Sequence, residues 1–473
     1  MKMLPLAILC LSFSTTTLAA APTPEDPAVT AARVKTEFLH AWDDYVKYAW
    51  GHDELMPLSK RPKDWYGQSL LMTPVDALDT LVLMGLKDQA DKDRELIDTK
   101  LDFDKDIYVK NFEITIRLLG GLLSGYELTG DQRLLLLADD LGKRLMPAFT
   151  SPTGMPYQFV NLRTGKTRGA ESNPAETGTL YLEFGTLSLL TGDPRFGAAA
   201  RRALIETYNR RSTIGLVGDG IDVETGKWSS TDSHISGGID SYLEYQVKCM
   251  LLFSDGECMT MAAGSIDPVR RYLPEEVGGR LWYGHVDMNT GKRTAAEYGA
   301  LDAFFPAVLA LAGYLDDAKR LQDSGYYMWD LNHMEPEVYD YKSGKIEYPG
   351  YELRPEMVES TYYLWHYTHD PVYQQHARSM FADFVEYCRN DTGYAALKSV
   401  VTKQKRDAME SFVFAETFKY YYLIFAPAST LDFDSVVFNT EAHPLLRAIP
   451  PRLKLHGMQL TPADLQPRHP EHP

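Results

Sequence analysis

The chain has 473 residues, with 48 lysines and arginines against 65 aspartates and glutamates, which leaves a formal net charge of −17. So acidic a chain is a poor partner for a nucleic-acid backbone or an anionic membrane surface. Hydrophobic residues make up 44% of the sequence and charged residues 24%. This is the composition of a globular protein, not of a disordered or membrane-spanning one.

The first 21 residues have the pattern of a secretory signal peptide. Lys2 precedes an apolar run over residues 4–11, and three alanines occupy positions 19–21. The run is too short to span a bilayer, and no later apolar stretch reaches 18 residues. We therefore expect an exported protein, periplasmic or secreted, with no membrane anchor. Cleavage at the alanines leaves an odd number of cysteines, which allows at most one internal disulfide. These are Cys249, Cys258 and Cys388.

A short motif recurs along the chain at intervals of about 60 residues. Leu-Thr-Gly-Asp ends at Asp131 and again at Asp193, and looser copies place aspartates at positions 255, 316 and 370. Helix-like apolar spacing flanks each copy, and Asp followed by Pro or Gln is a turn and helix-start signal. The repeat predicts helix–turn–helix hairpins, seven of which would fill residues 30–440. Such an array can be an open solenoid or a closed double ring of helices.

A second series of acids runs in step with the first. One carboxylate precedes each turn and opens an apolar helical run. Any one of them could simply complement the helix dipole in the first turn. If the first helix of every hairpin lines the inside of a ring, however, the series places carboxylates around one mouth. Buried carboxylates have divergent pKa values, as general acid–base chemistry requires, and nearby Tyr and Trp suggest a sugar substrate. The series is Asp76, Glu113, Glu176, Asp240, Glu297, Glu356 and Glu410.

Competing chemistries have little support in the sequence. It contains no Gly-x-Ser-x-Gly, Gly-x-Gly-x-x-Gly, P-loop, His-Glu-x-x-His or Cys-x-x-Cys motif. No EF-hand loop is present either, although hard oxygen ligands are abundant.

Several longer segments resemble the class I α-mannosidases, glycoside hydrolase family 47. The matching motifs occur in order and span residues 76–444, and several are eight or more residues long. They are Phe112-Glu113-Ile-Thr-Ile-Arg117-Leu-Leu-Gly-Gly-Leu-Leu, Asp240-Ser-Tyr-Leu-Glu244-Tyr, Leu353-Arg-Pro-Glu356-Met-Val-Glu359-Ser, Met409-Glu410-Ser-Phe with Ala415-Glu-Thr-Phe-Lys-Tyr, and Phe438-Asn-Thr-Glu441-Ala-His-Pro.

The resemblance implies an all-α fold, a closed (α/α)7 barrel of seven helical hairpins. We place this catalytic domain at residues 28–445, between the signal peptide at 1–21 and a Pro-rich tail at 446–473. The implied activity is removal of terminal α-1,2-linked mannose from oligosaccharides with inversion, dependent on one Ca2+. We expect a monomer.

The resemblance also assigns roles to individual residues. Glu113 resembles the general acid and Glu356 the general base, and Asp240 is the third catalytic carboxylate and an alternative acid. Thr440 resembles the threonine whose carbonyl and hydroxyl bind calcium directly, and Glu176 is among the carboxylates that hold the calcium's waters. The expected substrate-binding residues are Arg117, Glu337, Arg354, Glu359, Glu410 and Glu441.

Some features depart from the family pattern or leave alternatives open. Ala300-Leu301 stands where the family usually has His-Leu, which puts subsite contacts in doubt. One sequon, Asn390-Asp-Thr392, is present. Two alternatives remain at this stage: a non-catalytic relative that binds mannose glycans, and a helical-barrel glycosidase for a different glycan.

Overall fold

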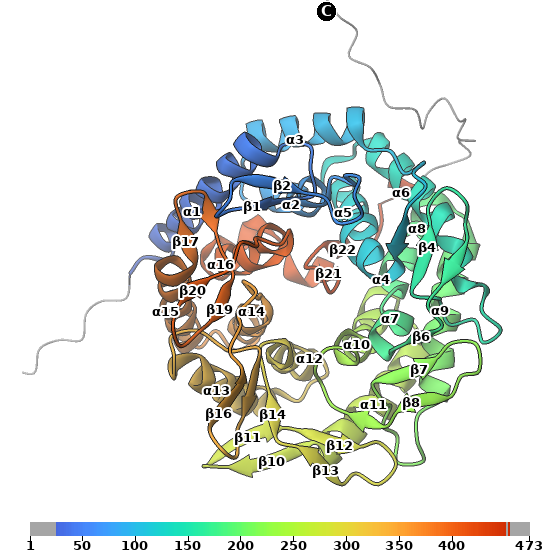
Figure 1. Cartoon of the computed structure of the whole chain (residues 1–473), viewed down its shortest axis with the longest axis vertical. Helices are drawn as coiled ribbons and strands as arrows, with labels where there is room; N and C mark the ends of the chain where they lie inside the picture. Colours follow the sequence, from blue (N-terminus) through green and yellow to red (C-terminus); the bar gives the residue numbers. More distant parts are fainter. Residues whose placement is uncertain (1–24, 451–452, 455–473) are drawn as a thin grey trace, which may run out of the picture.

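A computed structural model describes residues 25–450 and 453–454. The predicted signal peptide lies outside the described residues, as does most of the Pro-rich tail. Figure 1 shows the helices arranged as a ring in two layers, with the chain running once around it. The predicted helical fold is confirmed.

Helices of the outer layer are amphipathic. In α3 only Ala90, Asp93 and Ile97 are buried, so one narrow stripe faces the inner layer and the rest faces solvent. The outer helices are α1 (Pro27–Ala49), α3 (Lys87–Lys100), α6 (Gln132–Leu145), α9 (Pro194–Asn209), α11 (Gly256–Tyr272), α13 (Leu315–Asp330) and α15 (Pro371–Cys388).

Helices of the inner layer are buried on nearly all sides. In α2 every residue except Val82 is buried, and apolar residues therefore occur on all sides of this helix. The inner elements are α2 (Met72–Leu83), α4 (Asn111–Ile114) with η1 (Thr115–Leu119) and α5 (Gly120–Thr129), α7 (Pro174–Gly178) with α8 (Tyr181–Thr191), α10 (Asp240–Phe253), η3 (Leu301–Phe304) with α12 (Phe305–Leu311), α14 (Glu356–Thr368), and η4 (Val413–Thr417) with α16 (Phe418–Phe425).

Each inner helix packs against one outer helix and against its inner neighbours. The pairs are α2 with α3, α5 with α6, α8 with α9, α10 with α11, α12 with α13, α14 with α15, and α16 with α1. Inner-layer contacts run from α2 through α5, α8, α10, α12 and α14 to α16, and η4 contacts α2 again. Within the described residues the inner helices therefore complete a circle.

The recurring Gly-Asp motif forms the turns from inner to outer helices. Gly130 and Gly192 end their helices with a positive φ, of 75° and 80°, a conformation that suits glycine. The next residues, Asp131 and Asp193, cap the outer helices by accepting a backbone N–H. Asp255 and Asp370 do the same. The weaker copy at Asp316 differs, because Tyr314 holds the cap position and Asp316 lies in the first turn of α13.

The connections from outer to inner helices are longer and contain short strands that were not predicted. Because each of these connections leads into the start of an inner helix, the strands gather at one end of the ring, its mouth. The sheets are β1 (Glu54–Met56) with β2 (Arg61–Lys63); β3 (Tyr108–Lys110), β4 (Phe159–Asn161) and β5 (Thr167–Arg168); β6 (Glu171–Ser172), β7 (Gly220–Asp222) and β8 (Trp228–Ser230); β9 (Asp232–Ser233), β12 (His285–Asp287) and β13 (Arg293–Ala295); β10 (Pro274–Val277) with β11 (Arg280–Tyr283); β14 (Glu297–Tyr298), β15 (Val338–Asp340) and β16 (Lys345–Tyr348); β17 (Arg389–Asn390) with β18 (Gly393–Tyr394); and β19 (Leu397–Ser399) with β20 (Gln404–Lys405).

The expected carboxylate series needs one correction. Glu297 does not open a helix: it lies in β14 and pairs with Asp340 of β15. The inner helical segment of that hairpin begins later, at Leu301. The hydrophobic spacing predicted a helix start at Glu297, which is too early. A strand of only two residues, like β14, leaves no alternating pattern that would separate it from the helix.

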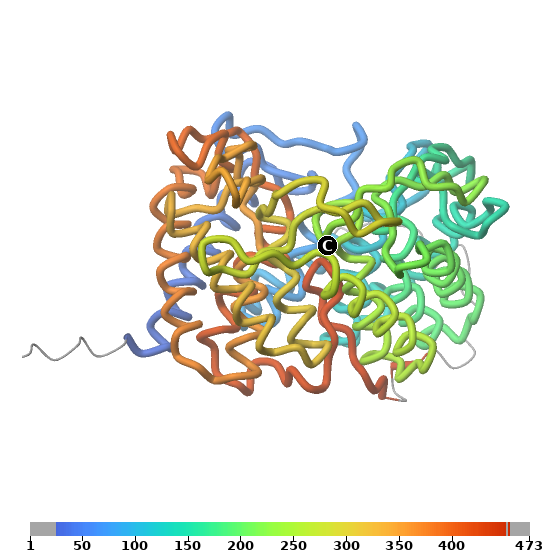
Figure 2. The backbone as a smooth tube through the Cα atoms, turned by 90° about the horizontal axis from the view of Figure 1, so that it is seen from below, coloured from blue at the N-terminus to red at the C-terminus, as the bar shows by residue number. Residues whose placement is uncertain are grey.

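The last two strands lie elsewhere, in the centre of the ring. β21 (Val436–Phe438) and β22 (Pro444–Leu446) form an antiparallel hairpin that contacts α10 and α5. Short helical turns η5 (Ala428–Thr430) and η6 (Phe433–Ser435) lead into it from α16, and η2 (Met146–Thr150) follows α6 elsewhere in the ring. Figure 2 shows this red segment rising between the helices.

Two adjacent glycines let α5 approach both the hairpin and α2 closely. A Cβ atom at Gly120 would lie 2.5 Å from Nδ2 of Asn439, and one at Gly121 would lie 2.7 Å from the carbonyl oxygen of Val75. Neither position has room for a side chain. The Gly-Gly pair in the sequence motif is therefore explained by packing.

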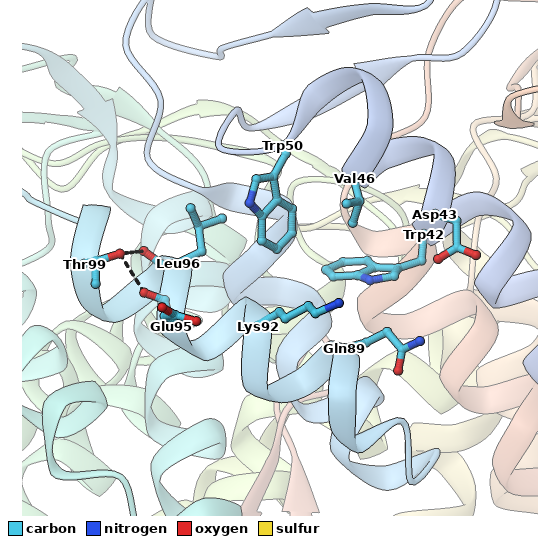
Figure 3. A pocket seen from close by; sticks show the side chains of 9 residues that line it. All are labelled: Trp42, Asp43, Val46, Trp50, Gln89, Lys92, Glu95, Leu96 and Thr99. Atoms are coloured by element: carbon cyan, nitrogen blue, oxygen red, sulfur yellow. Dashed lines mark hydrogen bonds between the residues drawn. The ribbon is translucent and has the colours of Figure 1, made fainter. Parts of the chain in front are cut away.

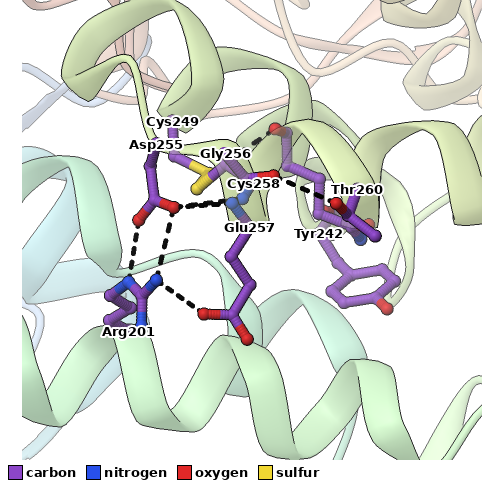
Figure 4. Close-up of a disulfide and its surroundings, with 9 residues drawn as sticks. Arg201, Tyr242, Cys249, Asp255, Gly256, Glu257, Cys258 and Thr260 are labelled. Atoms are coloured by element: carbon purple, nitrogen blue, oxygen red, sulfur yellow. Dashed lines mark hydrogen bonds and ion pairs between the residues drawn. A yellow bond between two sulfur atoms is a disulfide. The ribbon is translucent and has the colours of Figure 1, made fainter.

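One disulfide joins α10 to α11. Cys249 and Cys258 are bonded, and Asp255 between them caps α11 and pairs with Arg201 of α9 at 2.8 Å (Figure 4). Cys388 is free and buried. Among the described residues, no helix has both the length and the apolar character needed to cross a membrane.

Candidate active site

A cavity in the centre of the ring brings together acids from three inner-layer elements and the tip of the C-terminal hairpin. Four sequence-predicted residues line it, and each comes from the end of its element that faces the mouth: Asp240, Glu356, Glu359 and Thr440. The other lining residues are Ser241, Glu244, Leu301, Phe304 and Glu416. Part of the cavity was therefore predicted correctly from the sequence, whereas two of its acids, Glu244 and Glu416, were not.

Helix geometry explains why these acids share one face. Asp240 is the first residue of α10 and Glu356 the first of α14. Glu244 and Glu359 follow them by four and three residues, which places each pair on the same side of its helix. Glu416 lies in η4, a short π-helical segment, and such segments are frequent at functional sites.

Burial of these carboxyl groups raises their affinity for protons. Burial raises the pKa of Asp240 to about 6 and that of Glu356 to about 7. Burial likewise raises the pKa of Glu359 to about 8, and it raises that of Glu416 well above the ordinary value. In Glu359 and Glu416 the neighbouring acids add to the effect, because like charges disfavour ionisation. The cavity thus favours either protons or a bound cation.

A lysine partly balances this charge from below. The ammonium group of Lys248 forms an ion pair with Glu244 and lies 3.9 Å from Oε1 of Glu359. Tyr420 donates a hydrogen bond of 3.3 Å to the same Oε1. On Glu356, by contrast, Oε2 is buried and has no hydrogen-bond partner among the described residues. That oxygen is free to hold a water or a ligand.

Arg117 organises a second group of predicted residues beside the cavity. Its Nε lies 3.2 Å from Oε2 of Glu113, and its Nη1 forms an ion pair with Glu441. Asp76 is a third partner, at 3.7 Å. The guanidinium also lies 5.4 Å from the ring centre of Trp65, a distance that permits a cation–π interaction. Burial raises the pKa of Glu441 to about 8 despite its arginine partner.

Arg354 and Glu337 form a third group. Three contacts of 3.0–3.2 Å join the guanidinium to the two carboxylate oxygens, a bidentate arrangement that fixes both side chains. Glu335 lies nearby, fully buried, and neither carboxylate oxygen has a hydrogen-bond partner among the described residues. Burial, with Glu356 adding to it, raises the pKa of Glu335 well above the ordinary value. No sequence motif pointed to Glu335.

The remaining two predicted acids have partners outside the cavity. Glu410 shares a site with Glu54, and Lys63 lies 2.7 Å from Glu54 and 3.9 Å from Glu410. Glu176, in α7, pairs with Lys110 at 2.7 Å, and its second oxygen is buried without a partner among the described residues.

The acids that the sequence analysis missed share a recognisable signal. Glu244 and Glu416 lie within motifs that were quoted for their resemblance, and each interrupts an otherwise apolar helical run. A carboxylate in such a run is buried at a cost and usually has a function.

The tip of the hairpin holds Thr440 in a fixed position. The side-chain oxygen of Asn439 accepts from the backbone N–H groups of Glu441 and His443, at 2.9 and 2.8 Å. Its amide nitrogen donates to the carbonyl of Ile116 and to Glu183, at 2.9 and 2.8 Å. No hydrogen bond among the described residues uses the hydroxyl or the carbonyl oxygen of Thr440. Two hard oxygen atoms of one residue are therefore available beside the carboxylates.

A buried charge network anchors the same tip from beneath. His443 lies 2.7 Å from Asp79 through Nδ1 and 3.3 Å from Asp76 through Nε2. Lys419 lies 2.8 Å from Asp79 and donates to the carbonyl of Ala442 at 2.6 Å. Ala442 has a positive φ of 56°, a strained conformation for alanine that these contacts hold in place.

Position 300, where the family pattern is broken, does not line the cavity. Ala300 is fully buried, and its N–H donates to the carbonyl of Pro336 at 3.2 Å. The next residue, Leu301, is the one that contacts the cavity. The apolar wall at this point therefore comes from Leu301 and Phe304.

A second cluster of potential metal ligands lies away from the cavity. Asp232, His234 and His285 each offer one ligand atom within 4.8 Å of the others. The N–H of Ser236, however, donates to Nδ1 of His234 at 3.1 Å. Because Nδ1 accepts this bond, a neutral imidazole carries its proton on Nε2, which lies 3.6 Å from Asp219. Neither ring nitrogen of His234 then has a free lone pair for a metal. We interpret the cluster as a hydrogen-bonded network of the mouth.

Comparison with known proteins identifies the family. The model of glycosyl hydrolase family 47 matches residues 37–447. ER degradation-enhancing alpha-mannosidase-like protein 2 of Mus musculus is 36% identical over 486 residues, which cover 94% of this chain and 82% of that protein. A mannosyl-oligosaccharide 1,2-alpha-mannosidase of Arabidopsis thaliana is 36% identical over 454 residues, with coverages of 89% and 80%. The solved structure of alpha-1,2-mannosidase from Trichoderma reesei superposes with a TM-score of 0.82 at 28% identity, covering 89% of this chain and 99% of that one. This chain belongs to glycosyl hydrolase family 47.

Proposed function

We propose that the protein is an inverting, calcium-dependent α-1,2-mannosidase that removes terminal mannose from oligosaccharides. The observation that carries this proposal is the central cavity, where Asp240 and Glu356 meet Thr440. Membership of a glycosidase family supports the reaction class. The names of the Arabidopsis and Trichoderma relatives support the α-1,2 linkage.

In this proposal the seven inner–outer helix pairs form a closed (α/α)7 barrel over residues 28–445. Its mouth carries the short sheets and admits the substrate, and the hairpin β21–β22 fills its interior from the other end. The active unit in this proposal is a monomer.

Inverting hydrolysis needs two carboxyl groups in different protonation states. One donates a proton to the leaving oxygen, and the other activates a water on the opposite face of the sugar. We assign Glu356 as the base, because its unpartnered Oε2 can hold that water. Arg354 opposes the burial that raises the pKa of Glu356, and a cation in the cavity would favour the ionised form further.

Two residues are candidates for the acid. Glu113 is the family's expected donor, but its carboxylate lies 3.2 Å from Nε of Arg117 and is not among the residues that line the cavity. Asp240 lies in the cavity itself, and burial raises its pKa to about 6. This environment favours Asp240 as the group that carries a proton, with Glu113 as the alternative.

The residues of the cavity fit a calcium ion. All available donors are oxygens, which Ca2+ prefers, and its variable coordination leaves positions for water and substrate. Thr440 would bind it directly through the hydroxyl and the carbonyl, and Glu359, Glu416 and Glu441 would hold its waters. When bound, the ion would neutralise part of the cavity's negative charge and orient two sugar hydroxyls.

The remaining charged groups would bind the sugar. The paired Arg354 and Glu337 present hydrogen-bond donors and acceptors in fixed orientations, as do Arg117 and Glu441. Glu410 lies beside Glu54 and Lys63, so it would contact substrate nearer the rim than the cavity floor.

Export is part of the proposal. The disulfide between Cys249 and Cys258 supports an oxidising compartment, because such bonds are rare in reducing ones. A periplasmic or secreted enzyme would meet mannose-containing oligosaccharides from outside the cytoplasm.

The test is the anomer first released from an α-1,2-linked mannobioside, followed by NMR. We expect β-mannose to form before mutarotation equilibrates the anomers. Release of α-mannose first would contradict inversion. Binding without hydrolysis would favour the non-catalytic relative, and hydrolysis of other glycans in place of mannosides would favour a different glycosidase.

A further inference from the structure

A groove on the outer wall of the ring has the chemistry of a binding site and lies outside the catalytic centre. It is a cavity of about 390 Å3 between α1 and α3. This volume is within the usual range of small-molecule sites, about 300–1,000 Å3. Both helices belong to the outer layer, so the inner layer separates the groove from the central cavity (Figures 1 and 3).

Two indole rings form the apolar part of this α1–α3 groove. Trp42 lies at its base, almost completely buried, and Trp50 packs edge-on against it with ring centres 6.0 Å apart. Figure 3 shows both rings directed into the same space, with Leu96 beside Trp50. Trp50 is half-buried, so part of its ring is available to a ligand.

The polar part consists of exposed or half-buried side chains that have no partners among the described residues. Within the described part of the chain, no hydrogen bond or ion pair uses the side chains of Asp43, Gln89, Lys92 or Glu95, nor the indole nitrogens of the two tryptophans. Figure 3 shows Lys92 extending from α3 toward the indole of Trp42, with Gln89 beside it. Unpartnered donors and acceptors thus converge on an aromatic surface.

This combination selects a class of ligand. Two carboxylates and one ammonium group leave the groove slightly negative, which disfavours phosphate, sulfate and other anions. An apolar peptide would leave the polar groups desolvated and unpaired, at a cost for each. A neutral ring with many hydroxyls satisfies both parts: its C–H face packs on an indole, and its hydroxyls bond to the amide, the ammonium and the carboxylates.

We propose that the α1–α3 groove is a second saccharide-binding site, which holds a neutral hexose unit of a glycan while the central cavity acts on another unit. The choice of mannose as that hexose rests on the proposed function, whereas the site itself does not. Because the groove does not touch the cavity, its loss should weaken binding of large glycans and leave hydrolysis of a disaccharide unchanged.

The test uses fluorine NMR of the full protein labelled with 5-fluorotryptophan, in the Glu356→Gln background so that sugar is bound but not cleaved. The chain has seven tryptophans, and Trp50 and Trp65 are assigned by the signals lost in Trp50→Phe and Trp65→Phe. Trp65 packs on Arg117 and reports the catalytic centre, whereas Trp50 reports the groove. The probe is α-1,2-mannobiose.

We expect the Trp50 signal to shift with its own dissociation constant, different from that of Trp65. The double variant Gln89→Ala/Lys92→Ala should weaken the Trp50 titration at least about tenfold and leave that of Trp65 unchanged. Lys319→Ala, in the outer helix α13, is the matched control and should change neither.

Three results would overturn the groove proposal. The Trp50 signal does not shift when mannobiose is added, or the double variant does not weaken the Trp50 titration. The third is a Trp50 titration with the same dissociation constant as that of Trp65. If Trp50 responds and Trp65 does not, the groove is a saccharide site and the proposed function has failed. If only Trp65 responds, the function stands and the groove is not a saccharide site.

Discussion

Glu356 combines two properties that are seldom found together in a structural acid. It begins a helix, and one of its oxygens is buried with no hydrogen-bond partner among the described residues. Leaving such an oxygen unpaired costs on the order of 1–3 kcal/mol, which is the signature of a position kept for chemistry and not for stability.

Replacing this carboxylate should therefore abolish turnover and preserve the fold. We expect Glu356→Gln to lower the hydrolysis rate at least about a hundredfold, since a positioned acid or base typically contributes 10²–10⁴. Binding of an uncleaved mannoside should survive. Glu347→Gln, an exposed acid of β16, is the control and should behave as wild type. Near-normal turnover in Glu356→Gln would remove the base assignment.

The two candidates for the acid can be separated by the leaving group. A nitrophenyl leaving group needs little protonation, whereas a sugar leaving group needs a proton. We expect Asp240→Asn to lose at least about a hundredfold on α-1,2-mannobiose but far less on nitrophenyl α-mannoside. Glu113→Gln should reduce both rates by similar factors. The opposite pattern would make Glu113 the donor.

At the scale of elements, the turns were predictable and the strands were not. A glycine followed by aspartate specifies its turn locally, through a positive φ and a side-chain cap, so the sequence alone located Asp131 and Asp193. The strands of the mouth are two to four residues long. They are too short to show the alternation of apolar and polar residues by which a strand is recognised in a sequence. Asp316 is not a cap because the turn ends earlier, with Tyr314 at the cap position and α13 beginning at Leu315.

The residues of the candidate site also divide into those that were predictable from the local sequence and those that were not. Acids at helix starts, such as Asp240 and Glu356, carry a local signal. Glu416 and Glu335 do not, because only the closure of the ring brings η4 to the cavity and the segment before β15 close to Glu356. Thr440 is intermediate: its motif was recognisable, but its position depends on a hairpin that contacts α5 and α10 from across the ring.

The anchor of that hairpin should make stability depend on pH. Burial lowers the pKa of His443, but Asp79 and Asp76 outweigh it and raise the pKa to about 9. The protonated form is thus stabilised in the folded state. Its contribution is complete below the unfolded pKa of about 6.5 and is lost as pH rises through 9.

We therefore expect the free energy of unfolding to fall between about pH 6.5 and 9, by up to about 3 kcal/mol from this residue. The same ion pair, with Lys419, lowers the pKa of Asp79 to about 2 against the effect of burial, and the shared interaction is counted once. Urea unfolding at a series of pH values would measure the slope. His443→Gln should flatten it, and His333→Gln, at an exposed position, should not. An unchanged slope in His443→Gln would contradict the assignment.

At the scale of the whole molecule, the ring should unfold as one unit. Because each inner helix contacts both neighbours and η4 returns to α2, no division leaves two complete cores. Limited proteolysis should cut within the loops of the mouth without releasing a stable half. Two stable fragments separated near residue 240, each with a cooperative unfolding transition, would contradict a single barrel.

Calcium should stabilise this unit and be required for its activity. A ligand that binds only the folded state raises Tm by mass action, so a chelator should lower Tm and abolish hydrolysis, and added calcium should restore both. Magnesium should be a poor substitute, because it prefers a smaller and stricter octahedron. In Thr440→Val the Tm should no longer respond to calcium. Full activity in protein shown by elemental analysis to contain no metal would exclude the calcium proposal.

The central hairpin also sets an order of events during biosynthesis. Thr440 and Glu441 lie at its tip, so they are translated after every helix of the ring. The neighbouring Asn439 and His443 pack against Gly120 and Gly121 of α5, which are made far earlier. A nascent or truncated polypeptide that stops before residue 440 has its acids in place along the inner helices but lacks the threonine that completes the cavity. Because Thr440 is a calcium ligand in the proposed function, we expect such an intermediate to be inert toward glycans. On that proposal, hydrolysis begins only after the chain has been made to its final strands.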